Sequence, residues 1–277
     1  MMLNKILNEI SASEVKSSPF PHIVIDNLLD NQTMNELHEE LSNIKLNDIA
    51  SPRGEKIVVN GNQQYGSYVI NQASLESNED FKISSELNKN LSSNEFINSL
   101  LNKLSGYIEN SSDIKISDIT KNLEKNIINS EISILPSSYS SKRREIHLDS
   151  SEVILVFLYY VRLPNDYSFG GSLNLLNRED RYLFRSKTRS LIADFLNIFP
   201  SDLSVEKTYD YKDNRMVVMA SSGYSWHEVS TRRKATTPRI NFHGSVGNYS
   251  NKYETEYQQN KSLGFPIKNK LKFFFKL

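Results

Sequence analysis

The second half of the chain is divided into short apolar or alternating runs, each about as long as a β-strand. Turn-forming residues such as Pro164, Gly170-Gly171 and Pro200 separate the runs, and no long helical pattern lies between them. Because parallel strands need long crossovers, this succession is typical of an antiparallel sandwich or jelly roll. The runs are Ile132 to Leu135, Val153 to Val161, Ser172 to Leu176, Ser190 to Phe195, Arg215 to Ala220 and Pro238 to Val246.

The first residues predict a strand followed by an amphipathic helix. His22 to Ile25 is β-branched and apolar, which favours extended backbone. Asp30 or Asn31 then provides an N-cap. The apolar face of the predicted helix consists of Met34, Leu37 and Leu41.

The region from Lys45 to Asn90 is polar and rich in Asn and Ser. Within it, Lys56 to Val59 and Ser67 to Ile70 are expected to pair as strands, and the remainder is expected to be loop. A clearer helix begins at Ser92 or Ser93 and is expected to end near Gly106. The helices of the first half would cover a sheet built from the second.

Composition excludes several classes of site and partner. The 277 residues contain no cysteine, so any metal must be held by His and carboxylate rather than by thiolate. Lys and Arg number 33, as do Asp and Glu, and this balance gives no electrostatic reason to expect nucleic acid as a partner. With neither a signal peptide nor an apolar run that could span a bilayer, a cytoplasmic protein is expected.

His147-Leu148-Asp149 precedes the longest apolar run and is followed far downstream by His227 and Arg239. Side chains at i and i+2 of a strand point to the same face, so this segment would aim an imidazole and a carboxylate at one point. By itself a His-x-Asp pair is weak evidence, because an isolated His is more often structural. His227 would complete a set of three metal ligands.

Taken together, these motifs resemble those of the 2-oxoglutarate- and Fe(II)-dependent dioxygenases, in the prolyl-4-hydroxylase-like branch. The resemblance extends from near the start of the chain to about Val246. It is carried by Pro19 to Asn27, His147-x-Asp149, Gly170-Gly171-x-Leu173, Asn214 with its apolar strand, His227-x-Val229 and Arg239-x-Asn241.

The resemblance implies an α+β fold and a single domain over 1–277. Residues 128–247 would form a double-stranded β-helix (jelly roll) catalytic core, 1–127 would supply supporting helices and strands, and 248–277 would be a C-terminal extension.

It also implies the ligands and the reaction. His147, Asp149 and His227 would hold Fe(II), with no further catalytic residue, and Arg239 would bind the distal carboxylate of the co-substrate 2-oxoglutarate. Asn241, where relatives often have Ser, and Tyr139 would also contact the co-substrate. Molecular oxygen would be consumed, ascorbate would act as reductant, and a C–H bond of the primary substrate would be hydroxylated.

The primary substrate and the oligomeric state do not follow from the sequence. Basic runs around Arg143 and Arg233 precede and follow the metal motifs; such runs are usually solvated surface, but at the mouth of the site they would favour an anionic small molecule or peptide. Trp226 would pack beneath His227 or flank the substrate.

Two other functions remain open. A cupin-type metal-dependent isomerase or hydrolase would use the His and Asp ligands without needing Arg239. A catalytically silent jelly-roll module would use the same pocket only for binding.

Overall fold

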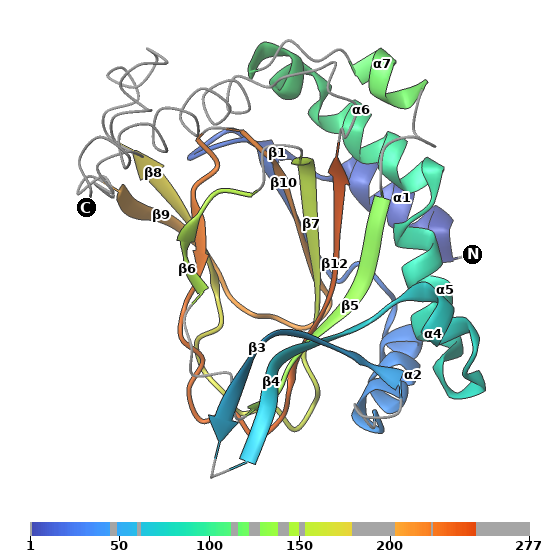
Figure 1. Cartoon of the computed structure of the whole chain (residues 1–277). Coiled ribbons are helices and arrows are strands. Elements are labelled where there is room, and N and C mark those ends of the chain that lie inside the picture. Colours follow the sequence, from blue (N-terminus) through green and yellow to red (C-terminus); the bar gives the residue numbers. More distant parts are fainter. Residues whose placement is uncertain are drawn as a thin grey trace, which may run out of the picture.

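The computed structural model describes residues 2–44, 49–59, 62–111, 116–121, 128–137, 144–149, 153–178, 203–222 and 224–247. Two sheets face one another, and helices cover the outer face of the larger one (Figure 1). The expected α+β class is confirmed, since every strand pair is antiparallel and the helices lie outside the sheets.

Among the described residues, the larger sheet has eight strands and the smaller has four. In spatial order the larger consists of β1 (Val15–Lys16), β2 (His22–Asp26), β10 (Arg215–Ala220), β7 (Val153–Val161), β12 (Arg239–Gly247), β5 (Ile128–Leu135), β4 (Asn62–Ile70) and β3 (Ser51–Val59). The smaller consists of β6 (Arg144–His147), β11 (His227–Val229), β8 (Leu173–Arg178) and β9 (Leu203–Tyr209).

The described helices precede the central strands in the sequence. They are α1 (Met2–Ala12), α2 (Asn31–Ser42), α4 (Gln72–Glu76), the 3-10 helix η1 (Glu79–Phe81), α5 (Lys82–Leu91), α6 (Asn94–Ser111) and α7 (Ile116–Thr120). None of these helices is long and apolar enough to cross a membrane.

The strand-and-helix entry agrees with the sequence prediction. β2 pairs with β10, and Asp30 caps α2 by accepting a hydrogen bond from the Thr33 amide at 2.9 Å. The face of α2 that packs on the sheet contains Met34, Leu37 and Leu41, all buried as expected.

Alternation along the central strands separates two cores. On β7, Phe157 and Tyr159 belong to the core beneath the helices, whereas Val156 and Tyr160 belong to a second core between the sheets. Because side chains alternate along a strand, Ile240 on the helix side of β12 places its neighbour Arg239 on the inner side. The inner faces of the two sheets therefore enclose the candidate site.

Three sequence predictions need correction. The Asn- and Ser-rich region does contain the paired strands β3 and β4, but it also forms α4 and α5 rather than loop. Helix α6 continues past Gly106 to Ser111, and β9 was not predicted at all. The strand expected at Ser190 to Phe195 and the extension at 248–277 lie outside the described residues.

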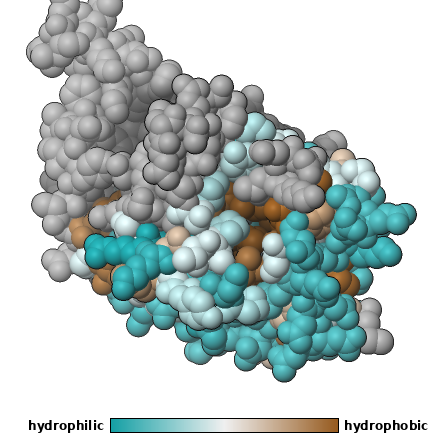
Figure 2. Space-filling model, turned by 90° about the horizontal axis from the view of Figure 1, so that it is seen from below, coloured by the Kyte–Doolittle hydropathy of each residue, from teal (hydrophilic) through white to brown (hydrophobic). Residues whose placement is uncertain are grey.

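The connections that follow β7, β9 and β11 lie together at one end of the sheets, the lower end in Figure 1. Backbone bonds join Phe169 to Arg233 and Ser172 to Ser230, which holds two of these connections side by side. Seen from this end, the coloured part of the surface is mostly hydrophilic, with a hydrophobic patch near its centre and smaller ones at its margins (Figure 2).

Candidate metal centre

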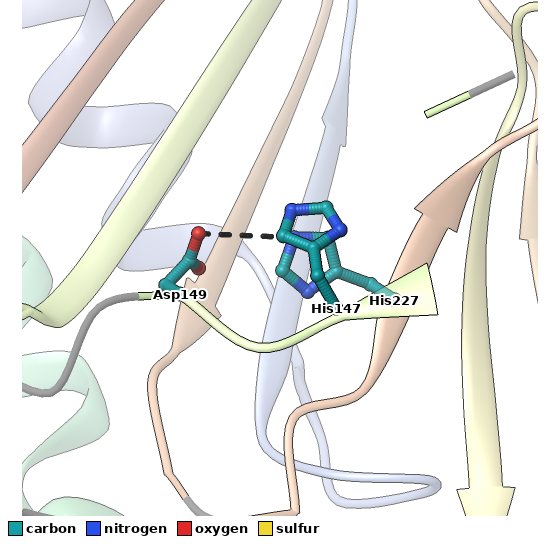
Figure 3. Close-up of side chains that lie close together, drawn as sticks. All are labelled: His147, Asp149 and His227. Carbon is teal, nitrogen blue, oxygen red and sulfur yellow. Dashed lines mark ion pairs between the residues drawn. The ribbon is translucent and has the colours of Figure 1, made fainter. Parts of the chain in front are cut away.

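Three potential metal ligands come together on the smaller sheet. His147 ends β6 and His227 begins β11, and the two are direct cross-strand partners. Asp149 follows β6 by two residues, so the chain turns its carboxylate back toward the imidazoles (Figure 3). The structure thus brings together the three residues that the sequence motifs singled out.

Their geometry suits a single ion. One donor atom from each residue lies within 4.8 Å of the others, and the two imidazole centroids are 4.3 Å apart. Asp149 Oδ1 lies 3.9 Å from His227 Nε2. Two imidazoles and one carboxylate are a donor set used by non-haem Fe(II), which leaves other coordination positions open.

The protein also orients His227 for such a role. Its side chain is buried, and Nδ1 lies 2.9 Å from the Ser225 carbonyl oxygen, an acceptor that requires a proton on Nδ1. In the neutral imidazole Nε2 is then unprotonated, and this nitrogen faces Asp149. A backbone carbonyl that fixes the tautomer in this way is a common outer partner of metal-binding histidine.

Arg239 is a buried cation on the inner face of the larger sheet. Its guanidinium donates to Asn241 Oδ1 at 3.2 Å and to the Gly171 carbonyl at 3.5 Å, while Nε makes no hydrogen bond of good geometry to a described residue. Its charge lies 5.1 Å from each of the ring centroids of Tyr160 and Tyr211. No carboxylate in the described part of the chain forms an ion pair with it, so this charge is suited to an anionic ligand.

Tyr160 is a polar residue of this site that the sequence interpretation missed. It lies opposite Asn241 in the β7–β12 register, and its buried hydroxyl interacts with the Arg239 guanidinium but makes no hydrogen bond of good geometry to a described residue. Burial raises the pKa of Tyr160, and the charge of Arg239 opposes that rise. The sequence did not single out Tyr160, because the apolar run that contains it indicates only a buried strand.

The sequence suggested that the basic run after His227 is solvated surface, but one of its residues is buried. Arg232 is 2% exposed and its Nη2 bonds Asp166 at 2.6 Å, whereas Arg233 and Lys234 are exposed. The backbone of Arg233 pairs with Phe169 at the lower end of the sheets.

The other candidates for substrate or co-substrate contacts are described only in part. Trp226 directly precedes His227 and is partly buried, and its indole nitrogen has no partner among the described residues. Tyr139 and Arg143 lie outside the described residues, so their roles stay predictions.

Comparison with known proteins was made at the levels of sequence and structure. No family model matches the chain, and no curated protein matches it. Similar solved structures include a Trichoplax adhaerens prolyl hydroxylase in complex with a hypoxia inducible factor oxygen degradation domain peptide fragment. The hydroxylase is 14% identical to this chain, the match covers 95% of this chain and 92% of that chain, and the TM-score is 0.46.

Two further structures are similar to the same extent. A Pseudomonas putida prolyl-4-hydroxylase is 11% identical, with 90% of this chain and 100% of that chain covered and a TM-score of 0.47. A non-heme alpha ketoglutarate dependent carbocyclase from nogalamycin biosynthesis is 9% identical, with coverages of 88% and 83% and a TM-score of 0.47. Likenesses of this size carry no argument about the reaction, so the function must be inferred from the site.

Proposed function

We propose that this protein is a 2-oxoglutarate- and Fe(II)-dependent dioxygenase that hydroxylates an unactivated C–H bond. The observation that carries the proposal is the pairing of two features between the same two sheets. A His-Asp-His set converges on one sheet, and a buried arginine that pairs with no carboxylate of the described residues lies on the inner face of the other. A metal and a dicarboxylate are the ligands that these features fit.

His147, Asp149 and His227 would hold the iron. When bound, Fe(II) would supply the redox chemistry that couples oxygen and 2-oxoglutarate to oxidation of the substrate, giving succinate and carbon dioxide. The residues do the positioning: the Ser225 carbonyl keeps His227 Nδ1 protonated, and this leaves Nε2 free of a proton to act as a ligand.

Arg239 would bind the distal carboxylate of 2-oxoglutarate. Its planar guanidinium can bind a carboxylate through two parallel hydrogen bonds, and Asn241 and Gly171 each accept one of its protons and so limit its rotation. Tyr160 would donate its hydroxyl, which makes no hydrogen bond of good geometry to a described residue, to the same carboxylate. Tyr139, expected from the resemblance, would add a further contact.

This assignment treats the two facing sheets as a double-stranded β-helix core over 128–247 within a single domain, buttressed by the residues before it. The primary substrate would be a peptide, including a prolyl peptide, or a small molecule, for which the basic residues favour an anionic one. Arg143, Arg233 and Trp226 are the proposed contacts to it. Ascorbate would serve as reductant.

Anaerobic titration tests the proposal. Fe(II) with 2-oxoglutarate should give a visible metal-to-ligand charge-transfer band, and 2-oxoglutarate at 100 times its Kd should raise the free energy of unfolding by about 2.7 kcal/mol. Metal binding without 2-oxoglutarate binding would support the cupin-type alternative. Binding of both without succinate formation in air would support the silent module.

Two substitutions separate the two halves of the site. Asp149→Ala should abolish Fe(II) binding, because one of three protein ligands is lost. Arg239→Met should leave Fe(II) binding intact but weaken 2-oxoglutarate about 100-fold, since two charge-assisted hydrogen bonds are worth about 3 kcal/mol together. Unchanged 2-oxoglutarate affinity in Arg239→Met would refute the assignment of Arg239.

The hydroxyl of Tyr160 can be tested by itself. Tyr160→Phe keeps the ring and removes only the hydroxyl, so the Kd of 2-oxoglutarate should rise about five- to tenfold, the equivalent of one hydrogen bond of about 1 kcal/mol. An unchanged Kd would exclude the hydroxyl as a contact.

A further inference from the structure

We infer that the buried Arg232–Asp166 ion pair is a positioning device for Arg239. It would hold the Gly170-Gly171 turn against the β11–β12 connection, so that the Gly171 carbonyl fixes the guanidinium that receives the co-substrate carboxylate. The inference rests on the proposed function and assigns a role to a pair that does not itself contact a ligand.

Arg232 is saturated by protein partners. Nε donates to Ser168 Oγ at 2.7 Å, Nη1 to the Thr237 carbonyl at 2.9 Å, and Nη2 to Asp166 Oδ2 at 2.6 Å. All three nitrogens are thus occupied within a nearly inaccessible side chain. In contrast to Arg239, Arg232 already pairs with a carboxylate, so its charge is not suited to binding an outside anion.

Asp166 is equally well enclosed. Its side chain is 0% exposed, and Oδ1 accepts a hydrogen bond from the Ser168 amide at 2.9 Å. Burial by itself would raise the pKa of Asp166, but the bonds from Ser168 and the charges of Arg232 and Arg162 lower it overall. The carboxylate therefore stays ionised opposite Arg232.

The ion pair acts directly on the glycine turn. The aliphatic stem of Arg232 lies against Gly171, where an added Cβ would be 3.5 Å from its Cδ. Gly170 has φ of +81°, and a Cβ there would be only 2.1 Å from the Thr231 carbonyl oxygen. The two connections are therefore in backbone contact, which only glycine allows at this place.

Arg239 is linked to the turn by a hydrogen bond and to Arg232 by a shared aromatic ring. The Gly171 carbonyl accepts from Arg239 Nη2 at 3.5 Å. The ring of Tyr211 is shared by the two arginines, with its centroid 5.5 Å from the Arg232 guanidinium and 5.1 Å from that of Arg239. Tyr211 Oη also accepts from the Ile240 amide at 3.0 Å, which ties the ring to the start of β12.

A buried ion pair is weak evidence of added stability, because desolvation offsets its Coulombic attraction. The effect of the pair on geometry is more specific. A two-bond contact to a carboxylate depends on the orientation of the Arg239 guanidinium plane, and a small displacement of that plane weakens binding. The effect of loosening the pair should therefore appear in co-substrate affinity beyond any change in stability.

The test is an anaerobic titration of the full chain with Fe(II) and 2-oxoglutarate, followed by the charge-transfer band. Loss of groups that orient binding residues costs about 10- to 100-fold in comparable sites, so Arg232→Lys should raise the Kd of 2-oxoglutarate about tenfold. The Kd of Fe(II) should not change. Ser168→Ala removes the hydroxyl that accepts from Arg232 Nε and also bonds Asp166, so it should raise the 2-oxoglutarate Kd about threefold and gives a milder variant should Arg232→Lys not fold.

Arg215→Lys is the matched control. Arg215 also forms a two-bond pair with an aspartate, Asp26, but contacts neither glycine of the turn, so its substitution should leave the Kd of 2-oxoglutarate within about twofold. In an Arg239→Lys background, Arg232→Lys should also have less than about a twofold effect, because the two residues act on the same contact.

The outcomes are distinct. The positioning role is overturned, while the proposed function stands, if the wild-type protein binds 2-oxoglutarate and both variants, Arg232→Lys and Ser168→Ala, bind it with the same Kd. A full tenfold effect in the Arg239→Lys background would overturn it as well. If the wild-type protein does not bind 2-oxoglutarate, both the inference and the proposed function fall.

Discussion

The ion pair between Asp26 and Arg215 makes a measurable prediction about stability and pH. Arg215 donates to the two carboxylate oxygens of Asp26 at 2.6 and 2.9 Å, joining β2 to β10, and Lys212 adds a contact at 3.1 Å. The hydrogen bond from Arg215 is the main cause that lowers the pKa of Asp26 from 3.8 to about 2.

A lowering of the pKa from 3.8 to about 2 would correspond to roughly 2–2.5 kcal/mol without screening. The side chain of Asp26 is 35% exposed, so solvent screening reduces the expected contribution to about 1 kcal/mol. Asp26→Asn should therefore lower the free energy of unfolding by about 1 kcal/mol at pH 7.

The pH dependence follows from the direction of the shift. A carboxyl whose pKa is lower in the folded state stabilises fully above its unfolded value of 3.8 and loses that contribution as the pH falls toward 2. About half of the difference between the wild-type protein and Asp26→Asn should therefore be gone at pH 3.

Urea unfolding followed by fluorescence of the single tryptophan, Trp226, measures this difference from pH 7 to pH 3. Asp80→Asn is the control, since Asp80 is an exposed carboxylate in η1 with no ion pair to a described residue. A difference that is zero at pH 7, or that stays constant down to pH 3, would refute the reasoning.

Three further substitutions test the packing and backbone arguments by urea unfolding. Asn214 has φ of +55°, and its buried side chain bonds both backbone groups of Leu29 and the hydroxyl of Tyr159, so Asn214→Ala should cost about 3 kcal/mol; a cost under about 1 kcal/mol would contradict this. Gly106→Ala should stabilise α6 by about 0.5–1 kcal/mol, because nothing lies within 4 Å of the added Cβ and alanine favours helix; destabilisation would show a hidden constraint. Gly170→Ala should instead cost about 3 kcal/mol or more, through overlap with the turn's neighbour and a positive φ, and a neutral effect would mean that the two connections separate easily.

Local patterns were enough to predict much of the architecture. The capped helix α2 and strands β7, β10 and β12 follow from apolar periodicity and turn residues, which act within a few residues of each other. The same strand alternation places Arg239 and Asn241 on one face. His147 and His227 could be proposed as partners only because their motifs occur in a known order.

Features that depend on distant partners could not be predicted. The local sequence indicates that Arg232 is solvated, because its ion-pair partner Asp166 lies 66 residues away. His38 lies among glutamates in the sequence, and nothing near it indicates that its Nε2 bonds Asp213 at 3.0 Å across 175 residues. Strand β9 was missed because its exposed side chains lack a clear apolar alternation.

The strict alternation of the central strands has a consequence for how the protein tolerates change. Along β7, β10 and β12, one set of positions faces the helices and the other faces the site, so neighbouring residues are subject to different selection. A saturation-mutagenesis map of these strands should show a period of two, with losses of abundance at Phe157 and Phe242 and losses of turnover at full abundance at Tyr160 and Asn241. The sheet thereby lets the scaffold and the chemistry evolve on opposite sides of a single backbone.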